Sequence, residues 1–319
     1  MEQAMTFYPY THAAFKYVGV WQENEEHQLV SYWNRSVAEI GFTGDEVVIH
    51  GTAEKPVTFC VDGGETLRGI PEGETVLTVE PGEHVLQIIT KGDSRLRLAG
   101  IAVKTGETVF RTPDKPYLQF IGDSITDACP GYSYTTGENL DVDYSVRAYS
   151  GMSLRDGWGW YPVPEGTVRP GMESMYYQLK GPLDTDRVPY RFAYCRQPDA
   201  FVIFLGTNDY LDSEADQNAG HVEIFAETYD RFVTGLASRY PKARFFLLQG
   251  LTDKYCRREG ILNAWQRMAA HLPQVTLVPS DQWLPEISAD GTHPSPKGYM
   301  ELAEKLTAYL IKEMKWQTR

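Results

Sequence analysis

A run of apolar residues that stops abruptly at a glycine constrains this chain more than any other stretch. Residues 117–126 read YLQFIGDSIT, so the run ends at Gly122 and is followed by Asp123 and Ser124. Such a run is typical of a strand buried in a parallel sheet, and the residues after it can open a helix. Ser124 would then lie at the carboxyl end of a strand, where open α/β sheets bind ligands. Its backbone N–H would have no partner inside the helix. Ser124 could therefore supply both a nucleophilic hydroxyl and an oxyanion donor.

Apolar runs of the same kind recur through the second half of the chain, with helical patterns between them. We expect strands at residues 117–121, 201–205, 244–248 and 275–278, and a weaker one at 143–149. Apolar residues at helical spacing fall within residues 222–240, 261–272 and 302–310. Strands that alternate with helices predict a parallel sheet covered on both faces.

The first half of the chain has a different pattern. Short alternating stretches end at turn signals such as Asp62-Gly63 and Pro81-Gly82, at a spacing of roughly ten residues. The expected strands are residues 29–33, 37–40, 57–61, 76–79, 85–89 and 95–98. This pattern predicts an antiparallel sandwich or jelly roll. Two prolines within 112–116 mark a boundary, so we predict an all-β domain at 1–112 and an α/β domain at 113–319.

Three further polar blocks follow expected strands. They are residues 149–153 (YSGMS), 206–209 (GTND) and 290–293 (DGTH). Because the carboxyl ends of parallel strands lie on one edge of the sheet, these blocks can converge on the serine at the end of the first strand. Just after the last block, Ser295 as the N-cap and Pro296 as the first helical residue predict the start of a helix.

The chemistry of the four blocks is complementary. Ser124 needs a general base, and an imidazole such as that of His293 is the most common one. Asp290, three residues before His293, can fix the tautomer of that ring. The backbone N–H groups of Ser124 and Gly151 and the side-chain amide of Asn208 would supply three donors to an oxyanion. Each block also has a structural interpretation, as a turn or a helix cap, but all four occur together in the right order.

Two acidic residues stand beside the candidate site residues, and a long segment follows the second block. We expect Asp123 and Asp209 to hold their loops by local hydrogen bonds rather than to react. Residues 157–197 are rich in Pro, Gly, Trp and Tyr and fit neither pattern. Loops of this length are often functional. Three rings in this segment, Trp158, Trp160 and Tyr161, follow the second block closely, so they either pack the loop or form a wall of the site.

Composition and spacing exclude several classes of function. The net charge is −13 and no basic stretch stands out, which argues against a nucleic-acid partner. No apolar run is long enough to span a membrane. The first ten residues show no signal peptide, and the four cysteines show no paired spacing, so we expect a cytoplasmic protein with free thiols, with a secreted origin as the alternative. The remaining histidines lack ligand spacing and no phosphate-binding loop occurs, so we expect neither a metal nor another cofactor.

Taken together, the motifs resemble the SGNH (GDSL-type) hydrolase superfamily. The four residues whose one-letter codes name the superfamily would be Ser124, Gly151, Asn208 and His293. The resemblance implies an esterase domain with a flavodoxin-like three-layer α/β/α fold. A jelly roll before such a domain resembles the second family of carbohydrate esterases, which includes acetylxylan esterases, and implies an acetylated sugar as substrate. Some members of that family lack the acidic partner of the histidine and use a Ser–His dyad, whereas Asp290 stands here at the superfamily position.

The function expected from the sequence is that of a serine esterase. It would remove short acyl groups, acetyl above all, from carbohydrates through Ser124, His293 and Asp290 and an acyl-enzyme intermediate. Its partner would be an acylated sugar or oligosaccharide, and the sequence makes no prediction of the oligomeric state. Two alternatives are a lipase- or thioesterase-like hydrolase of longer acyl esters and a non-catalytic carbohydrate-binding protein.

Overall fold

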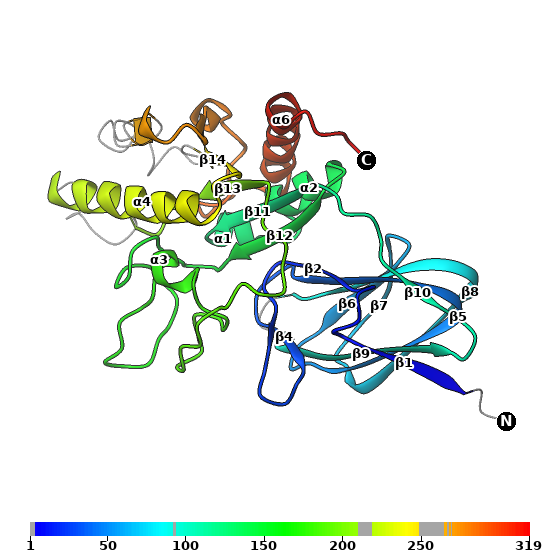
Figure 1. Ribbon diagram of the computed structural model, residues 1–319. Coiled ribbons are helices and arrows are strands. Elements are labelled where there is room, and N and C mark those ends of the chain that lie inside the picture. The colour runs from blue at the N-terminus through cyan, green and yellow to red at the C-terminus, as the bar shows by residue number, and fades with distance from the viewer. Residues whose placement is uncertain (1–3, 92–93, 210–218, 249–264, 267, 269) are drawn as a thin grey trace. The chain divides into compact units, whose positions relative to one another are not determined.

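The chain divides into two compact units. The computed structural model describes residues 4–91, 94–209, 219–248, 265–266, 268 and 270–319 (Figure 1). The first unit comprises Met1–Asp114 and Gln178–Arg196, and the second comprises Lys115–Tyr177 and Gln197–Arg319. The predicted division at residue 112 differs from this in two respects: the boundary lies two residues later, at Asp114, and segment 178–196 belongs to the first unit.

Segment 178–196 belongs to the first unit because its side chains and backbone form hydrogen bonds with residues of that unit. The hydroxyl group of Tyr194 donates a hydrogen bond to Glu23 Oε2 at 2.8 Å. The backbone N–H of Arg191 donates to Gln22 Oε1, also at 2.8 Å. The chain therefore leaves the second unit at residue 177, packs a segment on the first, and returns at residue 197.

The first unit is built on antiparallel strands, which agrees with the all-β domain predicted from the sequence. The strand order is β3-β4-β9-β5-β8-β6-β7, with β1 paired to β9 and with β2 and β10 paired to β5. The strands are β1 (Met5–Pro9), β2 (Lys16–Val18), β3 (Gln22–Glu23), β4 (Leu29–Ser31), β5 (Val37–Thr52), β6 (Val57–Val61), β7 (Gly64–Gly69), β8 (Glu72–Ile89), β9 (Leu96–Lys104) and β10 (Val109–Phe110).

One expected turn in this unit is wrong. The strands predicted at 76–79 and 85–89 are parts of the single long strand β8, which pairs with β5 along most of its length. The Pro81-Gly82 signal falls where the register with β5 shifts, opposite the step between Gly44 and Glu46. A bulge tolerates a proline, because the residue there need not donate to the ladder. The signal therefore marks a bulge instead of a chain reversal.

The second unit contains five parallel strands in the order β12-β11-β13-β14-β15. They are β11 (Tyr117–Gly122), β12 (Asp143–Ala148), β13 (Ala200–Phe204), β14 (Arg244–Leu248) and β15 (Val275–Val278). Each lies within a residue or two of a strand predicted from the sequence, so the parallel sheet is confirmed. Numbered along the chain, the order is 2-1-3-4-5, which is a common order for doubly wound sheets.

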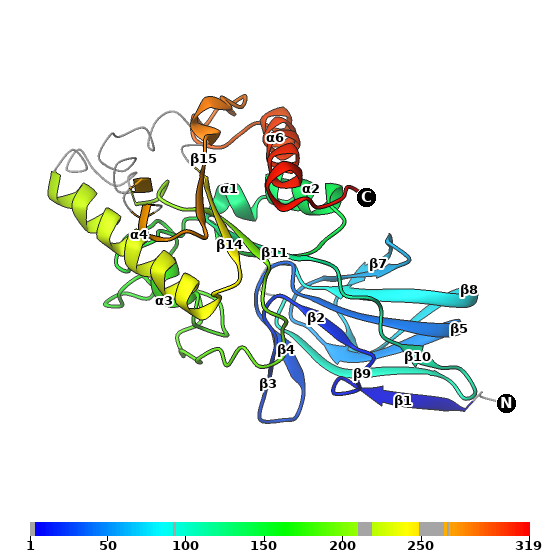
Figure 2. The ribbon, with the colours of Figure 1, turned by 45° about the horizontal axis from the view of Figure 1, so that its top comes forward.

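Helices cover both faces of this sheet (Figure 2). The described helices are α1 (Ser124–Asp127), α2 (Tyr132–Asn139), α3 (Met172–Met175), α4 (Ala219–Arg239), the 3-10 helix η2 (Ser280–Gln282) and α6 (Pro296–Met314). Leu306 of α6 belongs to the same apolar cluster as Val202 of β13. The neighbouring Phe201 contacts the ring of Tyr240, directly after α4, with centroids 5.1 Å apart. Since successive residues of a strand point to opposite faces, α6 and α4 cover opposite faces.

Two further expectations concern helices. Half of the residues of the helix predicted at 261–272 lie outside the described residues, although Trp265 and Met268 are described and buried. In the part of the chain that the structure describes, no helix has both the length and the apolar character needed to cross a membrane.

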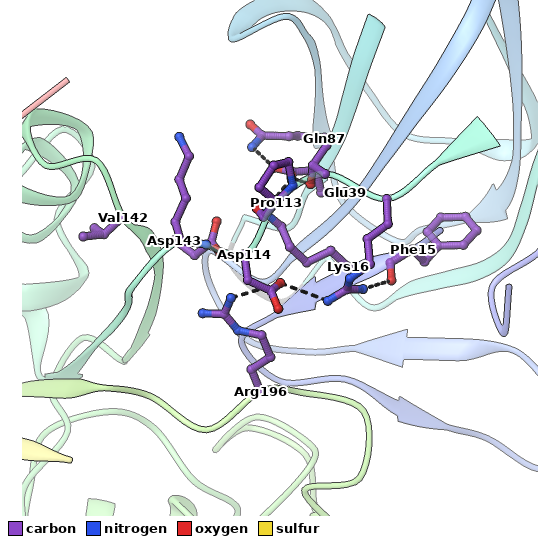
Figure 3. Close-up of polar contacts among 12 residues, drawn as sticks. Phe15, Lys16, Glu39, Gln87, Pro113, Asp114, Val142, Asp143 and Arg196 are labelled. Carbon is purple, nitrogen blue, oxygen red and sulfur yellow. Dashed lines mark hydrogen bonds and ion pairs between the residues drawn. The ribbon is translucent and has the colours of Figure 1, made fainter. Parts of the chain in front are cut away.

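A buried ion pair joins β2 to β5 inside the first unit (Figure 3). Lys16 Nζ lies 2.6 Å from Glu39 Oε1, and the two side chains are only 1% and 8% exposed. Gln87 donates to the other carboxylate oxygen at 2.6 Å, and the hydroxyl group of Thr112 donates to the first. Burial alone would raise the pKa of Glu39, but the hydrogen bonds from Lys16, Thr112 and Gln87 outweigh it and hold the pKa below its usual value. The carboxylate is therefore charged and fully paired.

Replacing Glu39 by glutamine should destabilise the protein strongly. The ammonium group of Lys16 would remain buried without a counter-charge, which typically costs about 3–5 kcal/mol in the free energy of unfolding. Chemical denaturation of the full chain measures this loss. The matched control is Asp45→Asn, because the pair between Asp45 and Lys104 is much more exposed and should contribute less than about 1 kcal/mol. Equal losses in the two variants would show that burial does not set the strength of the inner pair.

Candidate active site

The nucleophile candidate lies where β11 turns into α1. Ser124 is the first residue of α1 and is partly exposed. Asp123 caps the helix, because its Oδ1 accepts the N–H of Ile125 at 3.0 Å. A side chain on Gly122 would come within 2.0 Å of Thr126 Oγ1, so only glycine fits this turn. Asp123 thus holds its loop as expected, and its complete burial raises its pKa to about 6.

Ser124, His293 and Asp290 form one hydrogen-bonded chain. Ser124 Oγ lies 2.8 Å from His293 Nε2, and His293 Nδ1 lies 2.7 Å from Asp290 Oδ2. Since the carboxylate can only accept, Nδ1 carries the proton and Nε2 accepts the serine hydroxyl. This is the arrangement that activates a serine for attack on a carbonyl carbon. The structure therefore brings together the three residues for which the sequence predicts this chemistry.

The carboxylate of Asp290 is itself fixed by its own loop. Oδ1 accepts the backbone N–H groups of Thr292 at 2.8 Å and His293 at 2.9 Å, and the hydroxyl group of Ser288 at 2.8 Å. These bonds, first those from the N–H groups of His293 and Thr292, then those from Ser288 and the His293 ring, hold the pKa of Asp290 far below its usual value. Asp290 therefore stays ionised beside the imidazole.

Ser288 is the residue of this loop that the sequence analysis missed. Besides its side-chain bond, its backbone N–H donates to the carbonyl oxygen of His293 at 2.8 Å, which closes the loop. A serine two residues before an aspartate is a weak signal of such a turn. On the far side of His293, Ser295 caps α6 by accepting the N–H of Gly298 at 3.1 Å, as predicted.

The predicted oxyanion residues follow the two strands that flank β11. Gly151 comes after β12 with a φ of +79°, and its carbonyl oxygen accepts the N–H of Trp160 at 2.9 Å. A Cβ at this position would lie 2.9 Å from the backbone nitrogen of Tyr161. The close approach of residues 160–161 is thus a reason for glycine here in addition to substrate access. Asn208 comes after β13, and its Nδ2 donates to the carbonyl oxygen of Met152 at 2.9 Å. That bond uses one of the two N–H groups of the amide.

Comparison with known proteins agrees with this geometry. A family model described as the GDSL-like Lipase/Acylhydrolase family matches residues 120–300, which is more than half of the chain and contains every residue of the hydrogen-bonded chain. The chain belongs to this family. Its members are acylhydrolases, so this GDSL-like protein is a carboxylic ester hydrolase.

Solved structures resemble this GDSL-like hydrolase along nearly its whole length. A family two carbohydrate esterase from Cellvibrio japonicus has 15% sequence identity, a TM-score of 0.76, and coverage of 98% of this chain and 99% of its own. The acetyl xylan esterase Est2A from Butyrivibrio proteoclasticus has 20% identity, a TM-score of 0.76 and the same coverage. A carbohydrate esterase family 2 enzyme from Corynascus thermopiles (Myceliophthora fergusii) has 22% identity, a TM-score of 0.72, and coverage of 95% and 100%. At these identities the likeness shows a shared fold. No curated protein sequence matches significantly.

The three aromatic residues of the long segment have different environments. Tyr161 is 3% exposed and its hydroxyl group donates to the carbonyl oxygen of Pro170, so its ring packs the loop. This placement does not support the substrate contact expected for Tyr161. Trp158 stacks on His221 with centroids 4.0 Å apart and is half-buried. Trp160 is 49% exposed, and its backbone N–H donates to the carbonyl oxygen of Gly151, so its ring is free of the packing that buries Tyr161.

The structure also bears on metal binding. Among the residues that it describes, no group of three or more His, Cys, Asp or Glu side chains is arranged to hold a metal ion.

Replacing Asp290 by asparagine tests whether the carboxylate is needed. If Asp290 fixes the tautomer of His293, the turnover number should fall steeply, by up to about 10⁴-fold as in other serine enzymes. Ser288→Ala removes one of the bonds to Asp290 and keeps the bond to His293, so we expect a loss of less than about tenfold. Steady-state hydrolysis of a small aryl acetate measures both. A loss below about tenfold in Asp290→Asn would mean that Ser124 and His293 suffice as a dyad.

Proposed function

We propose that this hydrolase is a serine esterase that removes short acyl groups, acetyl above all, from carbohydrate hydroxyl groups. The observation that carries the proposal is the unbroken hydrogen-bonded chain from Asp290 through His293 to Ser124, which joins residues 169 positions apart. Gly151 and Asn208 support it, because they follow β12 and β13, the two neighbours of the strand that bears Ser124.

The mechanism follows from the roles that these atoms allow. Ser124 Oγ attacks the ester carbonyl carbon while His293 Nε2 takes its proton, and the carbonyl oxygen becomes an oxyanion. The N–H groups of Ser124 and Gly151 and the amide of Asn208 stabilise this charge. When the tetrahedral intermediate collapses, His293 returns the proton to the departing sugar oxygen, leaving an acyl group on Ser124. A water molecule activated by His293 then hydrolyses that acyl-enzyme and restores the serine.

Two observations favour a sugar over a long acyl chain. Several solved structures that resemble this chain along its length are described as carbohydrate esterases, and one as an acetyl xylan esterase. The exposed ring of Trp160 next to Gly151 offers an apolar face with a polar edge, which suits a sugar ring. We further infer that the two units are a jelly roll and a three-layer α/β/α domain, as the resemblance implies. The alternative of a lipase- or thioesterase-like hydrolase would need an apolar groove for the acyl chain.

A substrate panel separates these functions. The wild-type enzyme should release acetate from acetylated xylo-oligosaccharides, and its kcat/KM on aryl esters should fall by more than about tenfold from acetate to octanoate. Trp160→Ala should lower kcat/KM on the oligosaccharides by about tenfold, the equivalent of about 1.4 kcal/mol of binding, and spare a small aryl acetate. The matched control is Val168→Ala, since Val168 is 71% exposed on the same segment.

Other results of this panel would favour the alternatives. A preference for octanoate would favour the lipase-like alternative. Binding of the oligosaccharide without turnover of any ester would favour a carbohydrate-binding protein. Equal losses on both substrates in Trp160→Ala would mean that the ring supports the loop instead of contacting sugar.

A further inference from the structure

The loop that carries Gly151 is buried although it has no regular secondary structure. Residues 151–155 lie between β12 and the long aromatic segment, and Met152, Ser153 and Leu154 are fully buried. Backbone N–H groups in such a place need partners, because an unpaired buried donor is costly. The position of Gly151 therefore depends on what binds the backbone of the residues that follow it.

Asp209 supplies those partners from the end of the neighbouring strand. Its Oδ2 accepts the N–H of Leu154 at 2.8 Å, and its Oδ1 accepts the N–H of Arg155 at 3.1 Å. The residue before it, Asn208, binds the carbonyl oxygen of Met152 through Nδ2. Two consecutive side chains thus make three hydrogen bonds to a four-residue stretch of the loop. The same contacts fix the orientation of Asn208 relative to the glycine.

A carboxylate at this position is energetically expensive. Asp209 is 1% exposed, and burying an ionised carboxyl group is unfavourable unless hydrogen bonds offset the loss of hydration. Burial, together with the charge of Asp123, raises the pKa of Asp209 to about 7. A neutral asparagine would avoid this cost, but its amide offers only one acceptor and would direct N–H groups at a backbone N–H. Only the carboxyl group accepts both loop N–H groups at once.

We propose that Asp209 is a positioning residue of the oxyanion hole, which holds the loop so that the N–H of Gly151 and the amide of Asn208 point at one place. It acts through these two residues and does not contact the substrate. The proposal rests on the proposed function, because an oxyanion hole has meaning only for an acyl-transfer site. Donors that are misplaced by about 1 Å can cost about 10²-fold in rate. The two hydrogen bonds from the loop to Asp209, called the clamp below, should therefore have a measurable effect on catalysis.

Asp209→Asn tests the clamp with the smallest change of shape. We expect kcat on a small aryl acetate to fall by about 10²-fold, while KM changes by less than about threefold, because the interaction is lost mainly in the transition state. The rate of inactivation by an aryl methylphosphonate, whose tetrahedral adduct on Ser124 would place a phosphoryl oxygen where the oxyanion forms, should fall by a similar factor. Circular dichroism at the assay temperature establishes that the variant is folded.

The matched control is Asp156→Asn. Asp156 is the next residue after the clamped stretch, and its carboxylate also binds local groups, the N–H of Gly171 at 2.6 Å and the hydroxyl group of Ser174 at 2.7 Å. These contacts hold the start of α3 instead of the oxyanion loop, so kcat should stay within about twofold of wild type. A folded Asp209→Asn enzyme whose kcat falls no more than that of Asp156→Asn, or whose change is confined to KM, would overturn the proposal.

A measurement on the wild-type protein keeps the proposal testable if Asp209→Asn does not fold. Hydrogen exchange should show the amides of Leu154 and Arg155 protected, and exchange as fast as that of exposed loop amides would exclude the clamp. Ser124→Ala distinguishes the two possible failures. If that variant keeps full activity, the proposed function itself is wrong. If it is inactive while Asp209→Asn has wild-type kcat, only the role of Asp209 is refuted.

Discussion

The parallel pairing of β11 with β12 on one side and β13 on the other brings the active-site blocks together. In the register of the sheet, Gly122 pairs with both Ala148 and Phe204. Ser124 follows its strand by two residues, Gly151 by three and Asn208 by four, so all three leave the sheet at the same level and at the same edge. His293 reaches this edge from the loop before α6, whose N-terminal cap fixes where that loop ends. The hydrogen-bonded chain therefore depends on backbone pairing more than on any single side-chain contact.

Three carboxyl groups stabilise the loops at this edge of the sheet, each by accepting hydrogen bonds from backbone N–H groups. Asp123 caps the helix that begins with Ser124, and Asp209 binds the loop that carries Gly151. Asp290 binds the backbone of its own loop through one oxygen and the ring of His293 through the other. The first two are buried and have raised pKa values, whereas Asp290 is exposed and has a lowered one. This difference fits the proposed mechanism, in which only Asp290 must stay charged beside a histidine that takes up a proton.

The sequence predicts those features that local pattern determines. Apolar runs predict four of the five parallel strands and a weaker pattern predicts the fifth, and the order of the polar blocks predicts the Ser124–His293–Asp290 chain. Features that depend on contacts between residues far apart in the sequence could not be predicted. Segment 178–196 packs on the first unit, and Pro81 lies in a bulge because β5 runs alongside it. The environment of Tyr161 likewise could not be inferred, since an aromatic residue in a loop has the same local signal whether it packs inward or faces solvent. Ser288 was missed because a lone serine two residues before an aspartate is too common to single out.

The central claim is that Ser124 is the nucleophile of an acyl-transfer reaction, and covalent labelling tests it most directly. The enzyme would be treated with an aryl methylphosphonate and its peptides analysed by mass spectrometry, with the His293→Ala variant as a control for activation of the serine. The account predicts one adduct per chain, on the peptide that contains Ser124, and much slower labelling in the control. An adduct on any other residue, or labelling of Ser124 at an unchanged rate without His293, would contradict it.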